Sequence, residues 1–452
     1  MPMRRSPFIK TAFVLAFLLL VIDLGSSPGG DVLALVRRSG NTPIPAPLAR
    51  RIQVLQELES SWIARIPGRA KPALEAAGFS CEVLDPEPGN KTYFLVFTED
   101  PADAVSLDRF GKAKALDGKT CLFWTDDGRE AREVLPAQYE IKSLAPTDRV
   151  AANPDKSAAT GLPRAPGAVL KPPVYDPLIA GMVGQVSQAN LSAVILQLQS
   201  FGTRYASSQG CALAGDYLLN TFVQYGLAAE ADPFNFSSYS TRNIVATIPG
   251  AAFPEYVVLV GAHYDSISNQ AAVLAPGADD NASGTAAVVE IARILSQYRF
   301  DFTLKFACFG AEEWGLYGSK HYAQQAVSRG EKIIGVLNMD MIAYADRLPE
   351  DLDLVVNTKS AWLANRFAIC SAQYLSLPPL FKVVNASLRW SDHSPFWDQG
   401  YSALCGIEDY NVPNPYYHKT TDVFATLNMD FATSVTRVVL AVAAGLAQVS
   451  FQ

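Results

Sequence analysis

Residues 304–319 read LKFACFGAEEWGLYGS and place two adjacent acids directly after an apolar run. The run from Leu304 to Phe309 is typical of a strand that is covered on both faces of its sheet. A turn of small residues follows, and then Glu312 and Glu313 stand side by side. Like charges repel, and the end of a buried strand is a poor place for two of them. We therefore expect each carboxylate to have its own chemical task.

Strands of the same kind lie on both sides of this stretch. Near-continuous apolar runs recur at 256–263 and 333–340, and a strand is expected at 242–250. Helical patterns at 283–298 and 318–329 separate these runs. Further helices are expected at 190–201, 211–226 and 428–446, and further strands at 352–357 and 402–407. Alternating strands and helices predict an α/β fold over residues 178–452, with a mixed, largely parallel central sheet sandwiched by helices.

The chain is too long for one ordinary core. With 452 residues, two folded units are the default expectation. Residues 31–145 are read as a small α+β region, with a helix at 47–66 and strands at 92–100 and 119–127. Residues 146–177 are rich in Pro, Ala and Gly and predict a linker. The N-terminal region is either a propeptide that shields the functional site and is then removed, or a permanent accessory domain.

The first 27 residues differ in composition from the rest. Arg4, Arg5 and Lys10 precede a run of twelve apolar residues at 11–22, and small residues follow it. This order is typical of a secretory signal. A membrane anchor is the alternative, although twelve residues fall short of the roughly 20 that span a bilayer. We predict a signal peptide at 1–27 and a secreted or periplasmic protein.

Composition and cysteine content narrow the class of protein. Hydrophobic residues make up 49% and charged residues 18%, as in a globular protein, and the net charge of −7 speaks against a nucleic-acid partner. Six cysteines in an exported chain allow one or two disulfides, and Cys81–Cys121 is the first candidate pair. Cys308 lies inside an apolar strand, where a buried thiol is expected. The chain has no CxxC spacing, which disfavours zinc bound by cysteines.

Polar side chains follow several of the predicted strands at their carboxyl ends. His263 and Asp265 follow one strand, and Glu312 with Glu313 and Asp340 follow two others. A glycine-bounded acidic loop, PGADDNASG at 276–284, lies between the strand that precedes His263 and the strand that precedes Glu312. His418 comes late in the chain. Such sheets place their ligand sites beyond the carboxyl ends of the strands. Imidazole and carboxylate groups that converge there are the ligands of zinc or a similar divalent ion.

Two metal ions would explain the adjacent glutamates. A carboxylate that bridges two ions, each with one histidine and one further carboxylate, would neutralise the crowded negative charge. One glutamate of the pair would then bind metal. Its neighbour would take a proton from water, whose pKa a bound metal lowers from 15.7 to about 7.

Three of the neighbouring residues have structural explanations of equal or greater weight. Asp279 is expected to cap a helix or hold the loop, and His321 is expected on a helix surface. His393 either lines a substrate pocket or makes a structural hydrogen bond.

Five of these segments resemble motifs of the secreted two-zinc aminopeptidase family, which also contains glutamate carboxypeptidases and glutaminyl cyclases. The segments are GAHYDS, GADDNASG, GAEEWGLYGS, LNMDMI and YYHKTTD, at 261–266, 277–284, 310–319, 337–342 and 416–422. The resemblance extends over roughly 185–448 and includes SFGTRYA and RWSDHSPF. Residues 31–145 resemble no family that we can name.

The resemblance implies a role for each matched position. It implies two zinc ions per chain. His263 and Asp340 would bind one ion, Glu313 and His418 the other, and Asp280 would bridge both. Glu312 would act as general acid and base. Asp265 would orient the imidazole of His263, and Tyr417 would stabilise the oxyanion.

The resemblance predicts a zinc-dependent exopeptidase that removes N-terminal residues from peptides. Met341, Tyr410 and Tyr417 near the site suggest hydrophobic first residues. Three alternatives remain: a glutaminyl-peptide cyclotransferase on the same scaffold, a carboxypeptidase or dipeptidase, and a non-catalytic binding module. We expect peptide substrates, no nucleic acid, no stable membrane association beyond the N-terminal signal, and a monomer.

Overall fold

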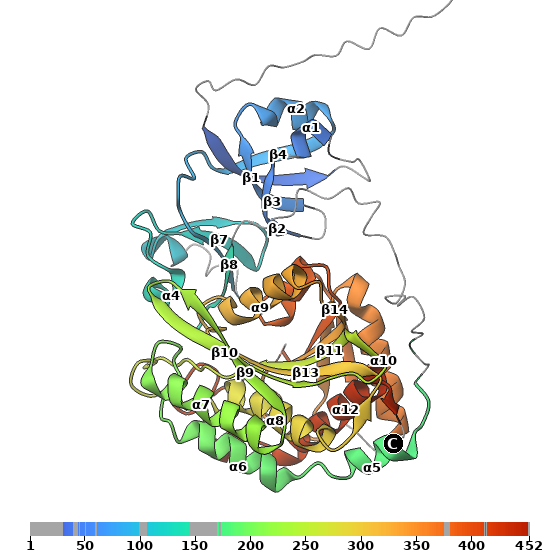
Figure 1. Ribbon diagram of the computed structural model, residues 1–452. Coiled ribbons are helices and arrows are strands. Elements are labelled where there is room, and N and C mark those ends of the chain that lie inside the picture. Colours follow the sequence, from blue (N-terminus) through green and yellow to red (C-terminus); the bar gives the residue numbers. More distant parts are fainter. Residues whose placement is uncertain are drawn as a thin grey trace, which may run out of the picture.

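The computed structural model describes residues 30–38, 44, 46–49, 51–58, 61–98, 106–144, 170, 173–374, 380–410, 412 and 414–450. The predicted signal peptide lies outside the described residues. Of the predicted linker, 146–177, only residues 170 and 173–177 are described. The chain from 173 onward forms one unit, which we call the C-terminal unit, and residues 30–144 form the N-terminal region (Figure 1).

An eight-stranded sheet runs through the middle of the C-terminal unit. Its strand order is β16-β15-β17-β14-β11-β13-β10-β9. The strands are β9 (Ala228–Phe236), β10 (Tyr239–Ile248), β11 (Phe253–His263), β13 (Phe302–Phe309), β14 (Lys332–Met339), β15 (Leu352–Val356), β16 (Leu380–Val384) and β17 (Ala403–Ile407). The four neighbours β13, β11, β14 and β17 run parallel to one another, and β9, β10 and the β15–β17 pairing are antiparallel. The predicted mixed, largely parallel sheet is confirmed.

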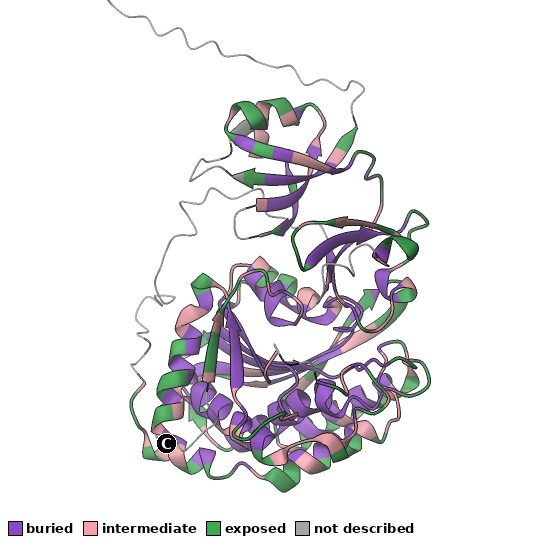
Figure 2. Cartoon of the chain, turned by 180° about the vertical axis from the view of Figure 1, so that it is seen from behind, coloured by how far each residue is buried: buried purple, intermediate pink, exposed green. Residues whose placement is uncertain are grey.

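Helices cover both faces of this sheet, as Figure 1 shows. One face packs against α5 (Pro177–Val183), α6 (Gln188–Gln199), α7 (Gln209–Gln224), α8 (Gly284–Leu295), α10 (Ala361–Gln373) and α12 (Met429–Ala447). The other face packs against α9 (Tyr317–Ser328) and α11 (His393–Asp398). The inner strands β11, β13, β14, β15 and β17 are buried almost throughout (Figure 2), which is why they read as continuous apolar runs. Helix α12 is long and apolar enough to span a membrane, but here it is a core helix.

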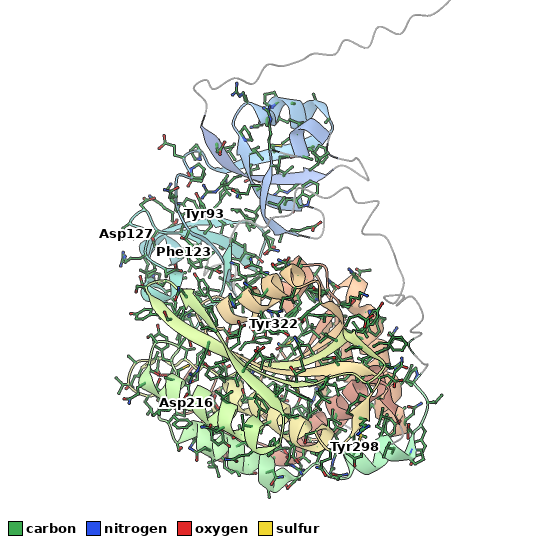
Figure 3. The ribbon with its side chains drawn as sticks, viewed as in Figure 1. Tyr93, Phe123, Asp127, Asp216, Tyr298 and Tyr322 are labelled. Atoms are coloured by element: carbon green, nitrogen blue, oxygen red, sulfur yellow. The ribbon has the colours of Figure 1, made fainter. Side chains whose placement is uncertain are left out.

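Aromatic side chains fill the space between the sheet and α9. Tyr322 on α9, labelled in Figure 3, lies 6.0 Å from the ring of Phe309 and 6.1 Å from that of Phe396. Phe309 is the last residue of β13, and Phe396 lies on α11. These rings therefore brace the end of the strand that precedes Glu312 and Glu313.

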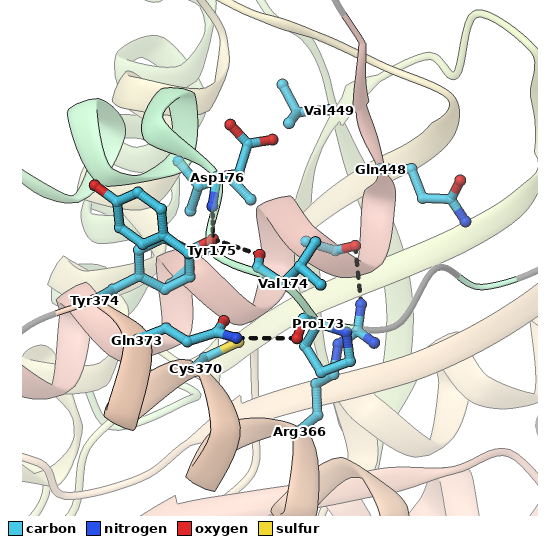
Figure 4. A pocket seen from close by; sticks show the side chains of 13 residues that line it. Pro173, Val174, Tyr175, Asp176, Arg366, Cys370, Gln373, Tyr374, Gln448 and Val449 are labelled. Atoms are coloured by element: carbon cyan, nitrogen blue, oxygen red, sulfur yellow. Dashed lines mark hydrogen bonds between the residues drawn. The ribbon is translucent and has the colours of Figure 1, made fainter.

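The chain enters the C-terminal unit through a segment that is anchored on α10. Tyr175 stacks on Tyr374 with ring centroids 5.5 Å apart, and Gln373 donates a hydrogen bond to the carbonyl oxygen of Pro173. The backbone N–H of Asp176 donates to the Tyr374 hydroxyl (Figure 4). The described chain is thus already fixed at residue 173, four residues before the predicted end of the linker at 177.

The N-terminal region consists mainly of strands. One four-stranded sheet has the order β2-β3-β1-β4 and the other β6-β7-β5-β8. Their strands are β1 (Asp31–Arg38), β2 (Gln53–Glu57), β3 (Ser61–Pro67), β4 (Phe79–Asp85), β5 (Tyr93–Phe97), β6 (Lys112–Ala115), β7 (Thr120–Trp124) and β8 (Glu140–Leu144). Only short helices accompany them, α1 (Ala46–Ala49), α2 (Ala70–Ala76) and α4 (Ala131–Val134). The strands predicted at 92–100 and 119–127 are confirmed.

The helix predicted at 47–66 is wrong. After the four residues of α1, the chain forms the antiparallel pair β2 and β3, with Gln53 opposite Arg65. Trp62 and Ala64 pack into one core of the region, and Ile63 between them packs into another. A strand alternates its side chains between two faces and can serve two cores, which one apolar stripe on a helix cannot.

The disulfide Cys81–Cys121 is also wrong. All six cysteines are free and buried. Cys81 and Cys121 belong to two different hydrophobic clusters in the two sheets of the N-terminal region, so they cannot pair without rearrangement. Cys308 is a buried thiol on β13, as predicted, and burial raises the pKa of that thiol.

Candidate metal centre

The candidate site lies at the carboxyl ends of three neighbouring parallel strands. His263 is the last residue of β11, Glu312 and Glu313 follow β13, and Asp340 follows β14. Strand β11 pairs with β13 on one side and with β14 on the other, so the three carboxyl ends meet at one edge. The sequence pattern predicted this convergence, and the structure shows it.

The acidic loop enters the same place through η3 (Ala278–Ser283). Gly277 before it has a φ of +52°, and a Cβ there would lie 2.5 Å from the Cβ of Ser266. Gly284 after it lies so close to β14 that a Cβ would be 2.6 Å from the carbonyl oxygen of Met339. Glycine is therefore required at both ends, and the tight loop brings Asp280 over the strand ends.

Asp280 lies between two histidine–carboxylate pairs. Its Oδ1 is 3.3 Å from His263 Nε2, which is also 3.2 Å from Asp340 Oδ1. Its Oδ2 is 3.0 Å from His418 Nε2, which is 3.2 Å from Glu313 Oε2. Each oxygen of one carboxylate thus faces a different pair.

Metal ions fit these distances. Two ligand atoms about 2.1 Å from a tetrahedral zinc ion lie about 3.3 Å apart. The buried His418 Nε2 and both carboxylate oxygens of Glu313 have no hydrogen-bond partner among the described residues. Although burial lowers it, the carboxylates of Glu312 and Asp340 raise the pKa of His263 well above its usual value. Buried ligand atoms that have no hydrogen-bond partner and lie amid concentrated negative charge suit divalent cations.

Glu312 also belongs to this cluster. One of its carboxylate oxygens lies within 4.8 Å of ligand atoms of His263 and Asp340, and all three residues are buried. Burial raises the pKa of Glu312 well above its usual value. Ala311 before it has a φ of +55°, so the backbone makes a left-handed turn that directs the two glutamates differently.

Asp265 holds this turn through its carboxylate. Oδ1 accepts a hydrogen bond from the N–H of Glu312 at 3.0 Å, and Oδ2 accepts one from Glu313 at 3.3 Å. His263 Nδ1 lies 3.2 Å from the backbone carbonyl oxygen of Asp265 and 3.7 Å from its carboxylate. The backbone of Asp265 therefore contacts the imidazole, and its side chain positions the glutamate pair.

His418 reaches the site from a loop near the end of the chain. Its φ of +53° turns the backbone, and the ring of Tyr417 stacks on its imidazole with centroids 3.8 Å apart. Tyr417 also packs, partly buried, against the hydrophobic cluster that contains Met341. The stacking fixes the plane of the His418 imidazole. Tyr417 therefore lies between this predicted ligand and the hydrophobic cluster.

Asp279, His393 and His321, for which the sequence offered structural explanations, make contacts of that kind. Asp279 accepts hydrogen bonds from the N–H of Ala343 and from Asn414 Nδ2, so it holds the loop. His393 Nε2 lies 3.0 Å from the carbonyl oxygen of Leu388, and burial lowers the pKa of this histidine to about 3. His321 is on helix α9, where it pairs with Asp232 at 3.1 Å.

Several residues that support the site could not be assigned from the sequence. Ser391 donates a hydrogen bond to Asp340 Oδ2, and Asp422 accepts from the N–H groups of Asp279 and Asp280. Arg204 is fully buried and donates to the carbonyl oxygens of Tyr264, Pro276 and Gly277 at 2.7–2.8 Å. Ser391 and Arg204 lie in RWSDHSPF and SFGTRYA, which carried the resemblance without showing what these residues contact.

Replacing Arg204 with methionine is expected to lower the free energy of unfolding by about 3 kcal/mol, because three buried carbonyl oxygens lose their charged donor. Urea denaturation followed by circular dichroism measures the change. Arg299→Met is the matched control, since Arg299 is exposed and should change stability by less than about 0.5 kcal/mol. Equal stability of the two variants would contradict the role assigned to Arg204.

Comparison with known proteins places this geometry among peptidases. A sequence model described as Peptidase family M28 matches residues 243–443. A probable leucine aminopeptidase of Arthroderma otae is 31% identical over 372 residues, which cover 78% of this chain and 90% of that protein. Leucine aminopeptidase 1 of Trichophyton equinum is 30% identical over 275 residues, which cover 56% and 72% of the two chains.

Solved structures share the fold. The LapA aminopeptidase of Legionella pneumophila superposes with a TM-score of 0.59 at 19% identity, over 80% of this chain and 99% of that chain. BSAP, a zinc aminopeptidase from Bacillus subtilis, has a TM-score of 0.53 at 16% identity, over 58% of this chain and 96% of that chain.

Proposed function

The chain belongs to peptidase family M28, and on that premise we propose that it is a secreted zinc-dependent aminopeptidase that releases N-terminal, preferably hydrophobic, residues from peptides. The observation that carries this proposal is the Asp280 carboxylate, whose two oxygens face two separate histidine–carboxylate pairs. The relatives named leucine aminopeptidase support the choice among the exopeptidases.

Two zinc ions would be held by five residues. His263 and Asp340 would hold one, Glu313 and His418 the other, and Asp280 would bridge them. When bound, zinc polarises the scissile carbonyl and lowers the pKa of an attacking water to about 7. A glutaminyl-peptide cyclotransferase with one metal would need only one histidine–carboxylate pair. The presence of a second pair, His418 and Glu313, therefore argues against that activity.

Glu312 would move the proton. Its carboxylate takes a proton from the attacking water and later delivers it to the leaving amine, as a general base and then acid. Asp265 serves this step by holding the N–H groups of Glu312 and Glu313, so that the two side chains keep their separate directions. Tyr417, stacked on His418, would donate to the developing oxyanion.

The preference for hydrophobic first residues has a structural basis beside the centre. Met341 is a member of a hydrophobic cluster, against which Tyr410, Tyr417 and Leu388 pack. These three side chains are only partly buried, so apolar surface remains to receive a substrate side chain. Secretion rests on the composition of residues 1–27, and a monomeric state remains a prediction.

We expect the zinc-loaded protein, freed of any inhibitory cover, to hydrolyse leucine p-nitroanilide, to lose this activity with a chelator and to regain it with Zn²⁺. Absorbance of released nitroaniline measures the rate, and atomic emission gives the zinc content. A peptide with a blocked N-terminus is the matched control, because an aminopeptidase cannot use it. Turnover that persists without metal would contradict the proposal. Ring closure of N-terminal glutamine without hydrolysis would favour the cyclotransferase.

A further inference from the structure

The N-terminal region packs directly over the candidate metal centre. Strand β8 is an edge strand of its sheet, and the N–H of Ser143 on it donates to the carbonyl oxygen of Gly315, 3.2 Å away. Lys320 donates to the carbonyl oxygen of Ser143, and the Tyr317 hydroxyl donates to Glu130. Strand β8 and helix α4 therefore lie against the segment that follows Glu312 and Glu313 (Figure 1).

A buried ion pair anchors β8 from its other side. Lys142 Nζ lies 2.5 Å from Asp398 Oδ2, and the other oxygen of Asp398 accepts from Gln56. Both Lys142 and Gln56 belong to the N-terminal region. Because Lys142 is buried, separating the two units would remove its ion-pair partner, which favours a docked state.

Arg132 shapes the segment that reaches the metal ligands. Its guanidinium donates to the carbonyl oxygens of Pro136, Ala137 and Tyr139, which closes residues 136–140 into a turn. Its Nε donates to the carbonyl oxygen of Glu313, 2.5 Å away. One buried side chain thus links this turn to a predicted metal ligand. We call residues 136–140 the strap.

The strap ends at the ligands themselves. His418 Nδ1 hydrogen-bonds to the carbonyl oxygen of Ala137. Glu140 Oε1 lies 3.6 Å from His418 Nε2, the atom that also faces Asp280 and Glu313. Glu140 is therefore a fifth carboxylate beside the centre, and it comes from a different folded unit from the other four.

The centre is nearly closed to solvent in the described chain. His263, Asp280, Glu312, Glu313, Asp340 and His418 are each only 1–6% exposed in the described chain. A peptide must bring its first carbonyl group to these side chains. The centre has to be uncovered before it can bind substrate.

We propose that the strap is a built-in inhibitor in which the Glu140 carboxylate occupies the ligand position at the His418–Glu313 side of the centre that a substrate or water needs. This proposal rests on the proposed function. Divalent ions bound at this centre would place positive charge beside the Glu140 carboxylate and attract it. The N-terminal region is then a removable propeptide rather than a permanent accessory domain.

The ends of the connecting segment suit removal by proteolysis. Strand β8 ends at Leu144, and the chain is anchored again from Pro173 near α5, on the opposite side of the C-terminal unit (Figure 1). A cut anywhere between them leaves both units with their described elements intact. The contacts of the strap then become intermolecular and can dissociate.

Glu140→Ala in the zinc-loaded full-length chain tests the proposal. We expect it to bind leucine hydroxamate, a metal-directed probe, about tenfold more tightly than the unaltered chain. The apparent affinity is proportional to the fraction of protein whose centre is uncovered, and the substitution should raise that fraction. Isothermal titration calorimetry measures the affinity, and leucine p-nitroanilide measures the rate, which should rise with it. Glu75→Ala is the matched control: Glu75 is an exposed glutamate on α2 and should change neither quantity.

Glu140→Gln keeps the size of the side chain and serves as a second test in case Glu140→Ala misfolds. It should also bind the probe more tightly than the unaltered chain. Unchanged affinity in both variants would overturn the proposal, and so would weaker binding, which is the result expected if Glu140 recognises the substrate amine. A mature secreted protein that begins near residue 30 would also overturn it. Tighter binding of the probe without any hydrolysis would contradict the proposed function but leave the strap proposal supported.

Discussion

Glu312→Gln is expected to lower kcat for leucine p-nitroanilide by about 10²–10⁴-fold, since it removes the group that carries the proton. Glutamine has nearly the same shape and keeps the amide groups held by Asp265 in place. The zinc content should therefore not change. The rate is measured on protein from which the N-terminal region has been cleaved, and zinc is measured by atomic emission on the same sample.

The neighbouring residue supplies a matched control. Glu313→Gln is the same substitution one position along the chain, but Glu313 faces His418 and Asp280 as a ligand. We expect this variant to lose zinc, whereas Glu312→Gln keeps it. The assignment would be refuted if Glu312→Gln lost metal while Glu313→Gln kept it, or if Glu312→Gln retained more than a tenth of the rate.

Asp280→Asn is expected to lower kcat/KM by about 10³-fold, corresponding to ~4 kcal/mol, because both metal ions lose the ligand they share. Although burial opposes this effect, the neighbouring imidazoles of His263 and His418 hold the pKa of Asp280 well below its usual value. Asparagine carries no charge and can offer only one oxygen. Zinc per chain, measured after dialysis, should fall from two to below one.

Asp279→Asn is the control in the same loop. Asp279 contacts Ala343 and Asn414, and its carboxylate faces away from the ligand set. This variant should keep its zinc and lose stability instead, which thermal unfolding will show. If Asp280→Asn retained two zinc ions while Asp279→Asn lost them, the bridge would have to be reassigned.

Much of the C-terminal unit could be predicted from local sequence because its inner strands are buried on both faces. Such strands read as apolar runs, and the polar residue that follows each run marks its carboxyl end. His263, Glu312, Glu313 and Asp340 are recognisable on this basis, since parallel strands bring their ends to one edge. The antiparallel edge strand β9 was not predicted, because an edge strand with alternating exposure has no continuous apolar run.

Partners that are distant in sequence have no local signal. Arg204 looks like an ordinary loop residue until the fold brings three carbonyl oxygens around it. The hydrogen bonds of Asp265 show the same limit: its position after β11 indicated contact with His263, but only the turn after β13 brings the amides of Glu312 and Glu313 to its carboxylate.

The sequence by itself determined the α/β class, the order of the strands along the chain and the residue types able to hold two metal ions. These properties depend on burial and on strand ends, which leave a local pattern in the chain. Only the tertiary structure decided that β3 is a strand serving two cores and that Cys81 and Cys121 lie in separate clusters. It alone also placed Glu140 beside His418. That contact joins two separately folded units through docked surfaces, and such docking has no period or spacing that a single sequence could reveal.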